Sequence, residues 1–281
     1  MPNGITLVLG GMGIKGAASI GVLQSMHDHD VKIKRIVATG ISALVGAQFS
    51  LDRDLDALTD YFVRFFTENH RYLWGLERLS GSTRHRTRRI ADSVSYFLRE
   101  SLYCRANLNR ISVLSWDIIE RDLKAFFGEV EPSDLRVPVT VSAIDLAQGR
   151  EVLLDEGNFA DRLKAGIAFP GLFPPVNVAG REIIGSTLYC ELPIDSLSEA
   201  ERPIVAVDIP RSPSNQRPAS ALEVVAQMDE LRGVAIKRKL LTKADRVFSL
   251  DELKGFQWGN YDQVPLMISR ARQGMDRLLE G

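Results

Sequence analysis

A short apolar segment near the N-terminus constrains the fold more than any other feature of the sequence. Residues Ile5–Leu9 are apolar or β-branched and end at Gly10 and Gly11, which predicts a strand that is buried on both faces. Apolar residues at helical spacing follow over 15–26, and a second apolar run comes at 35–39. Two strands that are joined through a helix in this way are typical of a parallel sheet.

The same alternation of short strands and longer helices continues along the chain. We therefore expect an α/β fold with a three-layer α/β/α core around a mainly parallel sheet. One domain over 1–281 is expected, with an Arg-rich helical insertion at about 71–127. The later predicted strands are 137–143, 151–154, 182–184, 204–209 and 246–250, and the later predicted helices are 54–67, 88–102, 107–127, 159–169, 219–241 and 261–279.

The composition excludes several classes of protein. A hydrophobic fraction of 45% is too high for a disordered chain, and a net charge of −1 argues against a general nucleic-acid binder. The sequence lacks a run of about 18 apolar residues, so we expect no transmembrane helix. Its two cysteines cannot form a disulfide framework, and its first residues do not resemble a secretory signal, so a cytoplasmic location is expected.

Positive charge is concentrated in one stretch. Between Arg71 and Arg110 there are nine arginines, no lysine and three acidic residues, which is an excess of six positive charges. The first interpretation is a solvated helix, and the second is contact with an anionic membrane surface, where each basic residue contributes about 1 kcal/mol. Such a peripheral membrane contact would involve Arg84, Arg86, Arg88 and Arg89.

The glycines after the first predicted strand allow two interpretations. Gly11, Gly13 and Gly16 have the G-x-G-x-x-G spacing of a dinucleotide-binding loop between a strand and a helix. That kind of site also needs an acidic residue at the end of the second strand, where this chain has Ala-Thr-Gly at 38–40. A nicotinamide or flavin site is therefore the less favoured interpretation, and no cofactor is expected.

The second interpretation depends on a serine that follows the second predicted strand. Residues 40–43, Gly-Ile-Ser-Ala, match the first four positions of the G-x-S-x-G turn that presents a nucleophile, and Leu44 replaces its last glycine. The positive end of a helix would favour an anion that develops at this serine. The glycine-rich loop could direct backbone N–H groups at that anion. An ordinary helix-capping serine is the alternative.

The order of strand, glycine-rich loop, helix, strand and serine turn resembles the patatin-like phospholipases. The stretch Ala-Phe-Pro-Gly-Leu-Phe-Pro-Pro-Val at 168–176 is similar to that family's A-x-P-G-x-F-P-P-V segment, and Leu-Pro-Ile at 192–194 is similar to its L-P-V. The resemblance covers most of the chain. It implies a patatin-like fold and a lipid acyl hydrolase with a Ser–Asp dyad, in which Ser42 is the nucleophile. It also implies an oxyanion-hole loop at Gly11, Met12, Gly13, Lys15 and Gly16.

Three departures from the family's pattern fall on this one site. The family's aspartate precedes the proline of L-P-V by eight residues, and this chain has Gly185 there. Leu44 replaces the second glycine of the serine turn, and Met12 replaces the middle glycine of the loop. A serine needs a base, and removal of one triad member lowers turnover by roughly 10⁴ in serine proteases. We therefore expect an impaired or inactive acyl hydrolase that binds a lipid or acyl ligand or acts through a partner.

The alternative is an active serine lipid acyl hydrolase, of phospholipase A, lysophospholipase or esterase type, in which another carboxylate replaces the base. The carboxylates considered for this role are Glu191, Asp195, Asp145 and Asp208. The histidines and aspartates at 27–30 are interpreted as a solvated turn, and no metal is expected.

Overall fold

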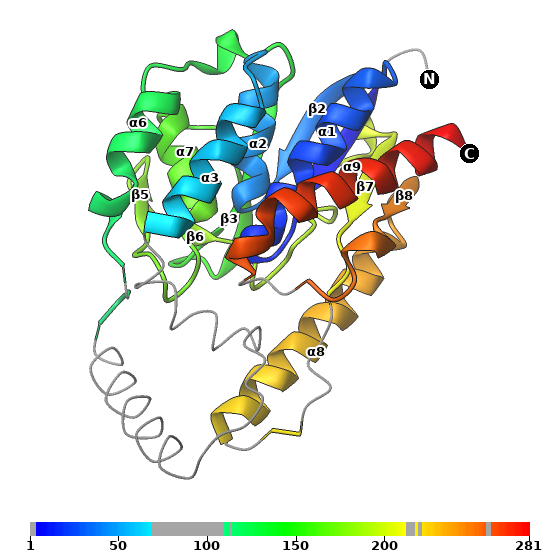
Figure 1. The fold of residues 1–281 in the computed structure, drawn as a ribbon. Coiled ribbons are helices and arrows are strands. Elements are labelled where there is room, and N and C mark those ends of the chain that lie inside the picture. The colour runs from blue at the N-terminus through cyan, green and yellow to red at the C-terminus, as the bar shows by residue number, and fades with distance from the viewer. Residues whose placement is uncertain (1–3, 69–109, 113, 212–216, 219–220, 257–259) are drawn as a thin grey trace.

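The computed structural model describes residues 4–68, 110–112, 114–211, 217–218, 221–256 and 260–281 (Figure 1). The strands in these ranges are β1 (Ile5–Leu9), β2 (Ile33–Ala38), β3 (Val139–Asp145), β4 (Arg150–Leu154), β5 (Val176–Val178), β6 (Arg181–Gly185), β7 (Ile204–Asp208) and β8 (Arg246–Ser249). The α-helices are α1 (Ser19–Asp28), α2 (Ile41–Ser50), α3 (Asp56–Glu68), α6 (Glu120–Phe127), α7 (Phe159–Ile167), α8 (Ala221–Leu241) and α9 (Val264–Glu280).

These strands form one sheet in the order β5-β6-β3-β2-β1-β7-β8, and β4 pairs with β3. The pairs β1–β2, β1–β7, β2–β3 and β7–β8 are parallel, whereas the pairs made by β4, β5 and β6 are antiparallel. The expected α/β fold with a mainly parallel sheet is therefore confirmed. Because the carboxyl ends of parallel strands lie at one edge of a sheet, the segments that follow β1, β2 and β7 meet there.

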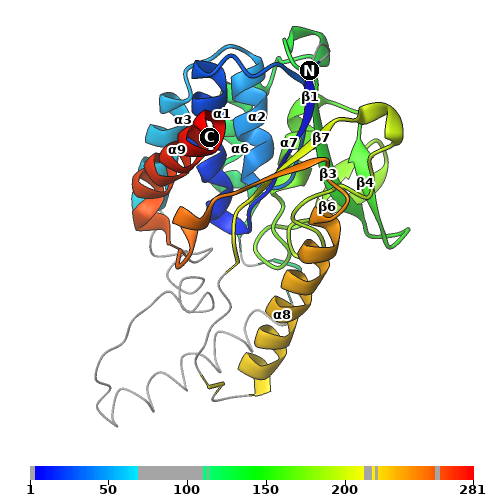
Figure 2. The same cartoon turned by 90° about the vertical axis from the view of Figure 1, so that its right-hand side faces the viewer.

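The central strand β1 packs on both of its faces. Leu7 and Leu9 are fully buried in the main core with α1, α2, α7 and α9. Val8 points to the other face, where Leu192 and Leu240 contribute to a smaller apolar cluster. Figure 2 shows most helices on one side of the sheet and α8 on the other. The second helical layer is thin, because it consists of the 190–197 segment and the last turns of α8.

The predicted strands all occur in the structure, with β5 in addition, but one predicted helix is shorter. The helix expected over 107–127 begins at Glu120. Before it, Ser115 accepts a hydrogen bond from the backbone N–H of Asp117 and caps a 3-10 turn. The backbone N–H of Leu114 donates to the carbonyl oxygen of Leu172 at 2.8 Å. The backbone of Leu114 is therefore hydrogen-bonded to the loop at Leu172 and does not form part of a helix that continues into α6.

The Arg-rich part of the sequence lies almost entirely outside the described residues. This includes the helix predicted over 88–102 and the membrane-contact candidates Arg84, Arg86, Arg88 and Arg89. Within the described ranges, each helix is either too short or too polar to span a bilayer.

Candidate functional site

The turn between β2 and α2 has the strained backbone that a nucleophile elbow requires, but at an unexpected residue. Gly40 has φ +56° and ψ −140° and precedes the first turn of α2. A left-handed φ is cheap for glycine and costly for a residue with a side chain. In a nucleophile elbow, the nucleophile itself occupies the sharp strand-to-helix turn. Gly40 has this conformation here, whereas Ser42 lies two residues later within the helix.

The hydroxyl of Ser42 is enclosed by protein atoms. Ser42 is 0% exposed, and its Oγ accepts a hydrogen bond from the hydroxyl of Ser19 at 2.9 Å. Its own proton is shared between the carbonyl oxygens of Gly10, at 3.1 Å, and Gly16, at 3.3 Å. These contacts join the start of α2 to the glycine-rich loop and to α1. They bring no carboxylate to Ser42 among the described residues.

The glycine-rich loop packs directly against this turn. A Cβ atom added at Gly16 would lie 3.0 Å from Ile41 Cβ and 3.0 Å from the backbone nitrogen of Ser42, so a larger residue would have to push the two turns apart. Gly11 and Gly13 have φ values of +143° and +58°. Met12 between them is buried and extended, and it precedes the 3-10 helix Gly13–Ala18. The structure therefore brings the predicted loop and the predicted serine turn together.

The predicted position of the missing aspartate lies at the end of β6. A Cβ atom at Gly185 would lie 2.6 Å from the carbonyl oxygen of Gly166 and 2.9 Å from that of Ala168, so a larger residue would have to displace backbone. The segment after β6 reaches the elbow through Thr187 instead. A Cβ atom at Gly40 would lie 2.8 Å from Thr187 Cγ2. A methyl group therefore occupies the space beside the elbow.

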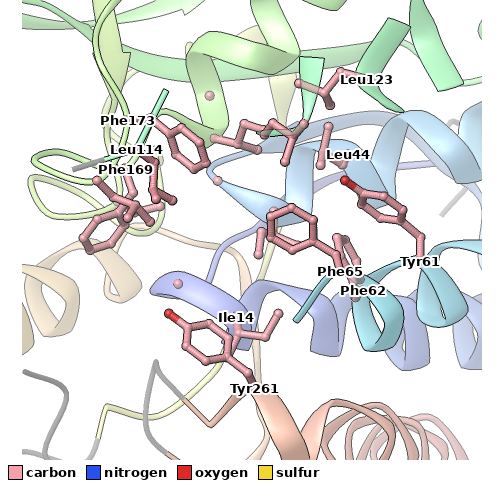
Figure 3. A pocket seen from close by; sticks show the side chains of 18 residues that line it. Ile14, Leu44, Tyr61, Phe62, Phe65, Leu114, Leu123, Phe169, Phe173 and Tyr261 are labelled. Atoms are coloured by element: carbon pink, nitrogen blue, oxygen red, sulfur yellow. The ribbon is translucent and has the colours of Figure 1, made fainter. Parts of the chain in front are cut away.

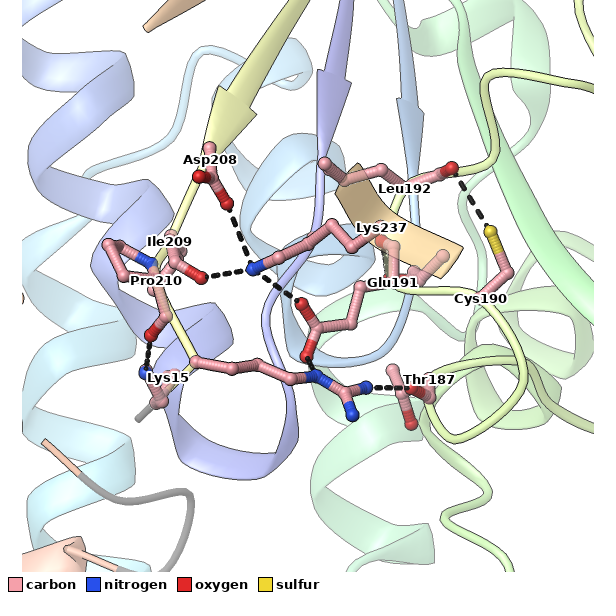
Figure 4. A network of polar contacts seen from close by, with 12 residues as sticks. Lys15, Thr187, Cys190, Glu191, Leu192, Asp208, Ile209, Pro210 and Lys237 are labelled. Carbon is pink, nitrogen blue, oxygen red and sulfur yellow. Dashed lines mark hydrogen bonds and ion pairs between the residues drawn. The ribbon is translucent and has the colours of Figure 1, made fainter. Parts of the chain in front are cut away.

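A cluster of buried charges fills the region beside this segment (Figure 4). The Glu191 side chain is 3% exposed and pairs with Arg211 Nε at 2.6 Å and with Lys237 Nζ at 3.1 Å. Lys237 also pairs with Asp208 at 2.9 Å and donates to the carbonyl oxygen of Ile209 at 2.6 Å. Buried carboxylates are stable only when paired in this way. Glu191 and Asp208 are therefore held by cations rather than directed at Ser42.

Lys15 belongs to the same buried region. Its ammonium group donates to the carbonyl oxygen of Pro210, at the start of the segment after β7. The pKa of Lys15 is lowered from 10.5 to about 8, chiefly by burial. The nearby Lys237 and Arg211 contribute to this lowering, and the attraction of Glu191 opposes it. Burial by itself would raise the pKa of Glu191, but Lys237 and Arg211 keep that pKa below its ordinary value.

The other two carboxylates that were considered as bases also have partners elsewhere. Asp195 forms an exposed ion pair with Lys243 at 2.5 Å. The Asp145 carboxylate accepts hydrogen bonds from the backbone N–H groups of Ala147 and Gln148, each at 3.0 Å. Among the described residues, no group of three or more histidine, cysteine or acidic side chains could hold a metal ion.

An apolar pocket begins at the elbow and extends along α2 and α3 (Figure 3). Its volume is about 110 Å³, and its lining includes Gly13, Gly40 and Thr187. Leu44 lines it too, whereas Ser42 does not. Its other walls carry Ile14, Ile41, Tyr61, Phe62, Phe65, Leu114, Ile119, Leu123, Gly166, Ile167, Phe169, Leu172, Phe173 and Tyr261.

The sequence-based prediction missed most of these residues. The aromatic side chains at 61, 62 and 65 have helical spacing on α3. This spacing predicts an apolar face of the helix, but it does not indicate which part of the protein that face packs against. The ion pairs of Arg211 and Lys237 with Glu191 could not be predicted from local sequence patterns, because Arg211 follows β7 and Lys237 lies on α8, both far from Glu191 in the sequence.

Ser42 is enclosed and does not line the pocket, whereas Gly40 is buried but lines it, and this difference predicts different reactivities for two cysteine variants. With Cys104→Ser as background, we expect Gly40→Cys to react with a small alkylating reagent much faster than Ser42→Cys. The remaining Cys190 is buried, and burial raises its pKa, so it contributes little background. Faster modification at 42 would contradict the geometry, and melting temperatures identify any variant that fails to fold.

The lowered pKa of Lys15 predicts a pH dependence of stability. The unfolded chain binds a proton at Lys15 up to about pH 10.5 and the folded chain only up to about pH 8, so the free energy of unfolding rises between these values. The rise is about 3 kcal/mol for a shift of this size. Urea unfolding at several pH values checks it, with Lys15→Met as the reference. Parallel curves for the two proteins would contradict the prediction.

Comparisons with known proteins identify the family. An NTE family protein of Mycobacterium tuberculosis is 24% identical over 190 residues, which cover 68% of this chain and 44% of that protein. The patatin-like phospholipase domain-containing protein 6 of Homo sapiens is 22% identical over 210 residues, which cover 74% of this chain and 13% of that protein. The chain thus spans less than half the length of either relative.

The crystal structure of VipD from Legionella pneumophila aligns with a TM-score of 0.48 and 13% sequence identity, over 99% of this chain and 67% of that one. The family model described as patatin-like phospholipase matches residues 7–197, from within β1 to the segment that carries Glu191. The chain therefore belongs to the patatin-like phospholipase family.

Proposed function

We propose that this protein binds an acyl chain or lipid in the pocket at the elbow and does not hydrolyse it. The observation that carries the proposal is that Gly40, which has no side chain, has the elbow conformation, while the hydroxyl of Ser42 is fully enclosed. Hydrolysis of an ester needs a nucleophile that can reach the carbonyl carbon and a base that can take its proton. In this proposal, Gly40 and Gly185 are the two positions from which these groups are absent.

The apolar pocket supports the binding part of the proposal. Its lining is almost wholly aliphatic and aromatic, which suits a hydrocarbon chain, and it reaches Gly40. A buried cavity of roughly 150 Å³ with similar walls binds benzene in an engineered lysozyme, so a pocket of this size class admits part of an acyl chain. The patatin-like phospholipase family is named for action on lipids, which agrees with this class of ligand.

The alternative of an active serine hydrolase would require a carboxylate at Ser42. The hydroxyl of Ser42 is bonded to Ser19 and to two backbone carbonyl groups. Glu191 is paired with two cations, and to act as a base it would have to leave both of them. We therefore place the inactive, ligand-binding function first.

The loss of hydrolysis predicts that Ser42 is not needed for any residual activity. The wild-type protein and Ser42→Ala should turn over a short-chain nitrophenyl ester equally slowly, and a fluorophosphonate probe should label neither protein. The reason is that an enclosed serine without a base is a poor nucleophile. Labelling and turnover that disappear in Ser42→Ala would refute the proposal and favour the hydrolase.

The binding function predicts that filling the pocket abolishes ligand uptake. Leu44→Trp places a larger side chain at a pocket position that is 4% exposed, whereas Val63→Trp adds the same side chain at a position that is 38% exposed and outside the lining. Titration with a fluorescent polyene fatty acid should give at least tenfold weaker binding for Leu44→Trp, equivalent to about 1.4 kcal/mol.

The matched control Val63→Trp should bind the fatty acid as the wild-type protein does. Near-ultraviolet circular dichroism and melting temperature show whether both variants remain folded. Equal binding by all three proteins would mean that the ligand does not occupy this pocket. If the wild-type protein does not bind the fatty acid, the proposed function is wrong.

A further inference from the structure

Thr187 is a polar side chain in the lining of the apolar pocket. Among the described residues, its hydroxyl group has no hydrogen-bond partner, and it is not one of the unpartnered polar atoms that are sealed from solvent. Thr187 is only 3% exposed, and it lines the pocket, so the hydroxyl group opens onto the pocket. A buried polar group without a partner is costly, and this one is available to a ligand.

The neighbours of Thr187 fix its orientation beside the elbow. The preceding side chain, Ser186, is fully buried and donates to the carbonyl oxygen of Ser142 at 3.0 Å. The backbone carbonyl of Thr187 accepts a hydrogen bond from Arg211 at 3.4 Å. Its methyl carbon lies 2.8 Å from the position of a Cβ atom at Gly40. The hydroxyl group is attached to the same carbon atom as this methyl group, so it also lies beside the elbow.

The first turn of α2 supplies a second donor at the elbow. Ile41 begins this helix directly after Gly40, and both residues line the pocket. The backbone N–H group of Ile41 donates to no other described residue. The first N–H groups of a helix have no partner within the helix, and together they favour an anion. The donors at the elbow therefore suit a negatively charged acceptor.

The buried charges beside this segment have the complementary sign (Figure 4). At neutral pH the cluster has three cations and two carboxylates, which leaves one positive charge in excess. Its members are Lys15, Arg211, Lys237, Glu191 and Asp208. Another carboxylate, Glu151, already accepts hydrogen bonds from Ser142 at 2.6 Å and from Ser196 at 2.7 Å. An excess of positive charge in a buried region favours a negative group on a ligand.

We propose that the ligand of the pocket is a free carboxylic acid rather than an ester, and that its carboxylate accepts hydrogen bonds from the Thr187 hydroxyl group and from the first turn of α2. This inference rests on the proposed function, because it names the class of ligand for the same pocket. A carboxylate offers two charged acceptor oxygens, and charge-assisted hydrogen bonds are stronger than neutral ones. An ester lacks that charge. Thr187 is therefore the residue that determines the preference for an acid, while the apolar walls hold the hydrocarbon chain.

Displacement of the fluorescent polyene fatty acid by octanoate and by methyl octanoate tests this preference. The wild-type protein should bind octanoate at least tenfold more tightly than methyl octanoate. Thr187→Val replaces the hydroxyl group with a methyl group of similar size. It should lower the preference about tenfold, because a hydrogen bond to a charged group is lost. Thr187→Ser retains the hydroxyl group and should retain the preference.

Thr6→Val is the matched control, because Thr6 is a fully buried threonine on β1 that does not line the pocket. It should retain the wild-type preference, and melting temperatures show whether each variant is folded. The preference is a ratio of two affinities, so a general loss of stability does not by itself change it.

The outcomes separate this inference from the proposed function. If the fluorescent fatty acid binds but methyl octanoate displaces it as well as octanoate does, or if Thr187→Val keeps the preference, the inference is wrong and the proposed function stands. If the fluorescent fatty acid does not bind at all, both are wrong. Octanoate affinity that falls about tenfold from about pH 6 to about pH 7 would mean that the neutral acid binds, which would overturn the carboxylate contact.

Discussion

The hydroxyl group of Ser42 is the contact on which the geometry of the site depends. It links α2 to the carbonyl oxygens of Gly10 and Gly16 and to the hydroxyl of Ser19, so it joins the two turns that follow β1 and β2. A buried hydroxyl is costly unless it is bonded, and here it is bonded to three groups. Its role in the fold is therefore the opposite of a catalytic role, because a nucleophile has to be free to leave its hydrogen bonds and reach a substrate.

The segment after β6 is held by charge rather than by apolar packing alone. Glu191 on this segment is paired with Arg211 and Lys237, and these cations come from the two segments that follow β7. Removing one partner of such a buried pair typically costs about 3–5 kcal/mol, because an uncompensated charge remains. The same pairs prevent Glu191 from acting as a base. The interactions that stabilise this edge of the sheet thus also keep its carboxylates away from the elbow.

The sequence was sufficient to predict the sheet but not the geometry of the elbow. Ile5–Leu9 was predictable as a buried strand because its residue types alone indicate burial on both faces. The serine motif was located by residue identity, and identity does not reveal which residue adopts a left-handed φ. That residue is Gly40, two positions before Ser42. The pairing of Glu191 with Lys237 depends on how α8 returns to the sheet, which local patterns do not specify.

The pocket beside the elbow carries a physical cost that its lining does not offset. Apolar side chains around an open space forgo the packing contacts that a filled core provides, at about 24 cal/mol per Å³ of cavity. Thr187 already places its methyl group beside Gly40, so larger side chains could have filled the rest of the space in the same way. A hydrocarbon ligand would recover these contacts, and the protein can therefore bind an acyl chain favourably without the groups needed to cleave its ester.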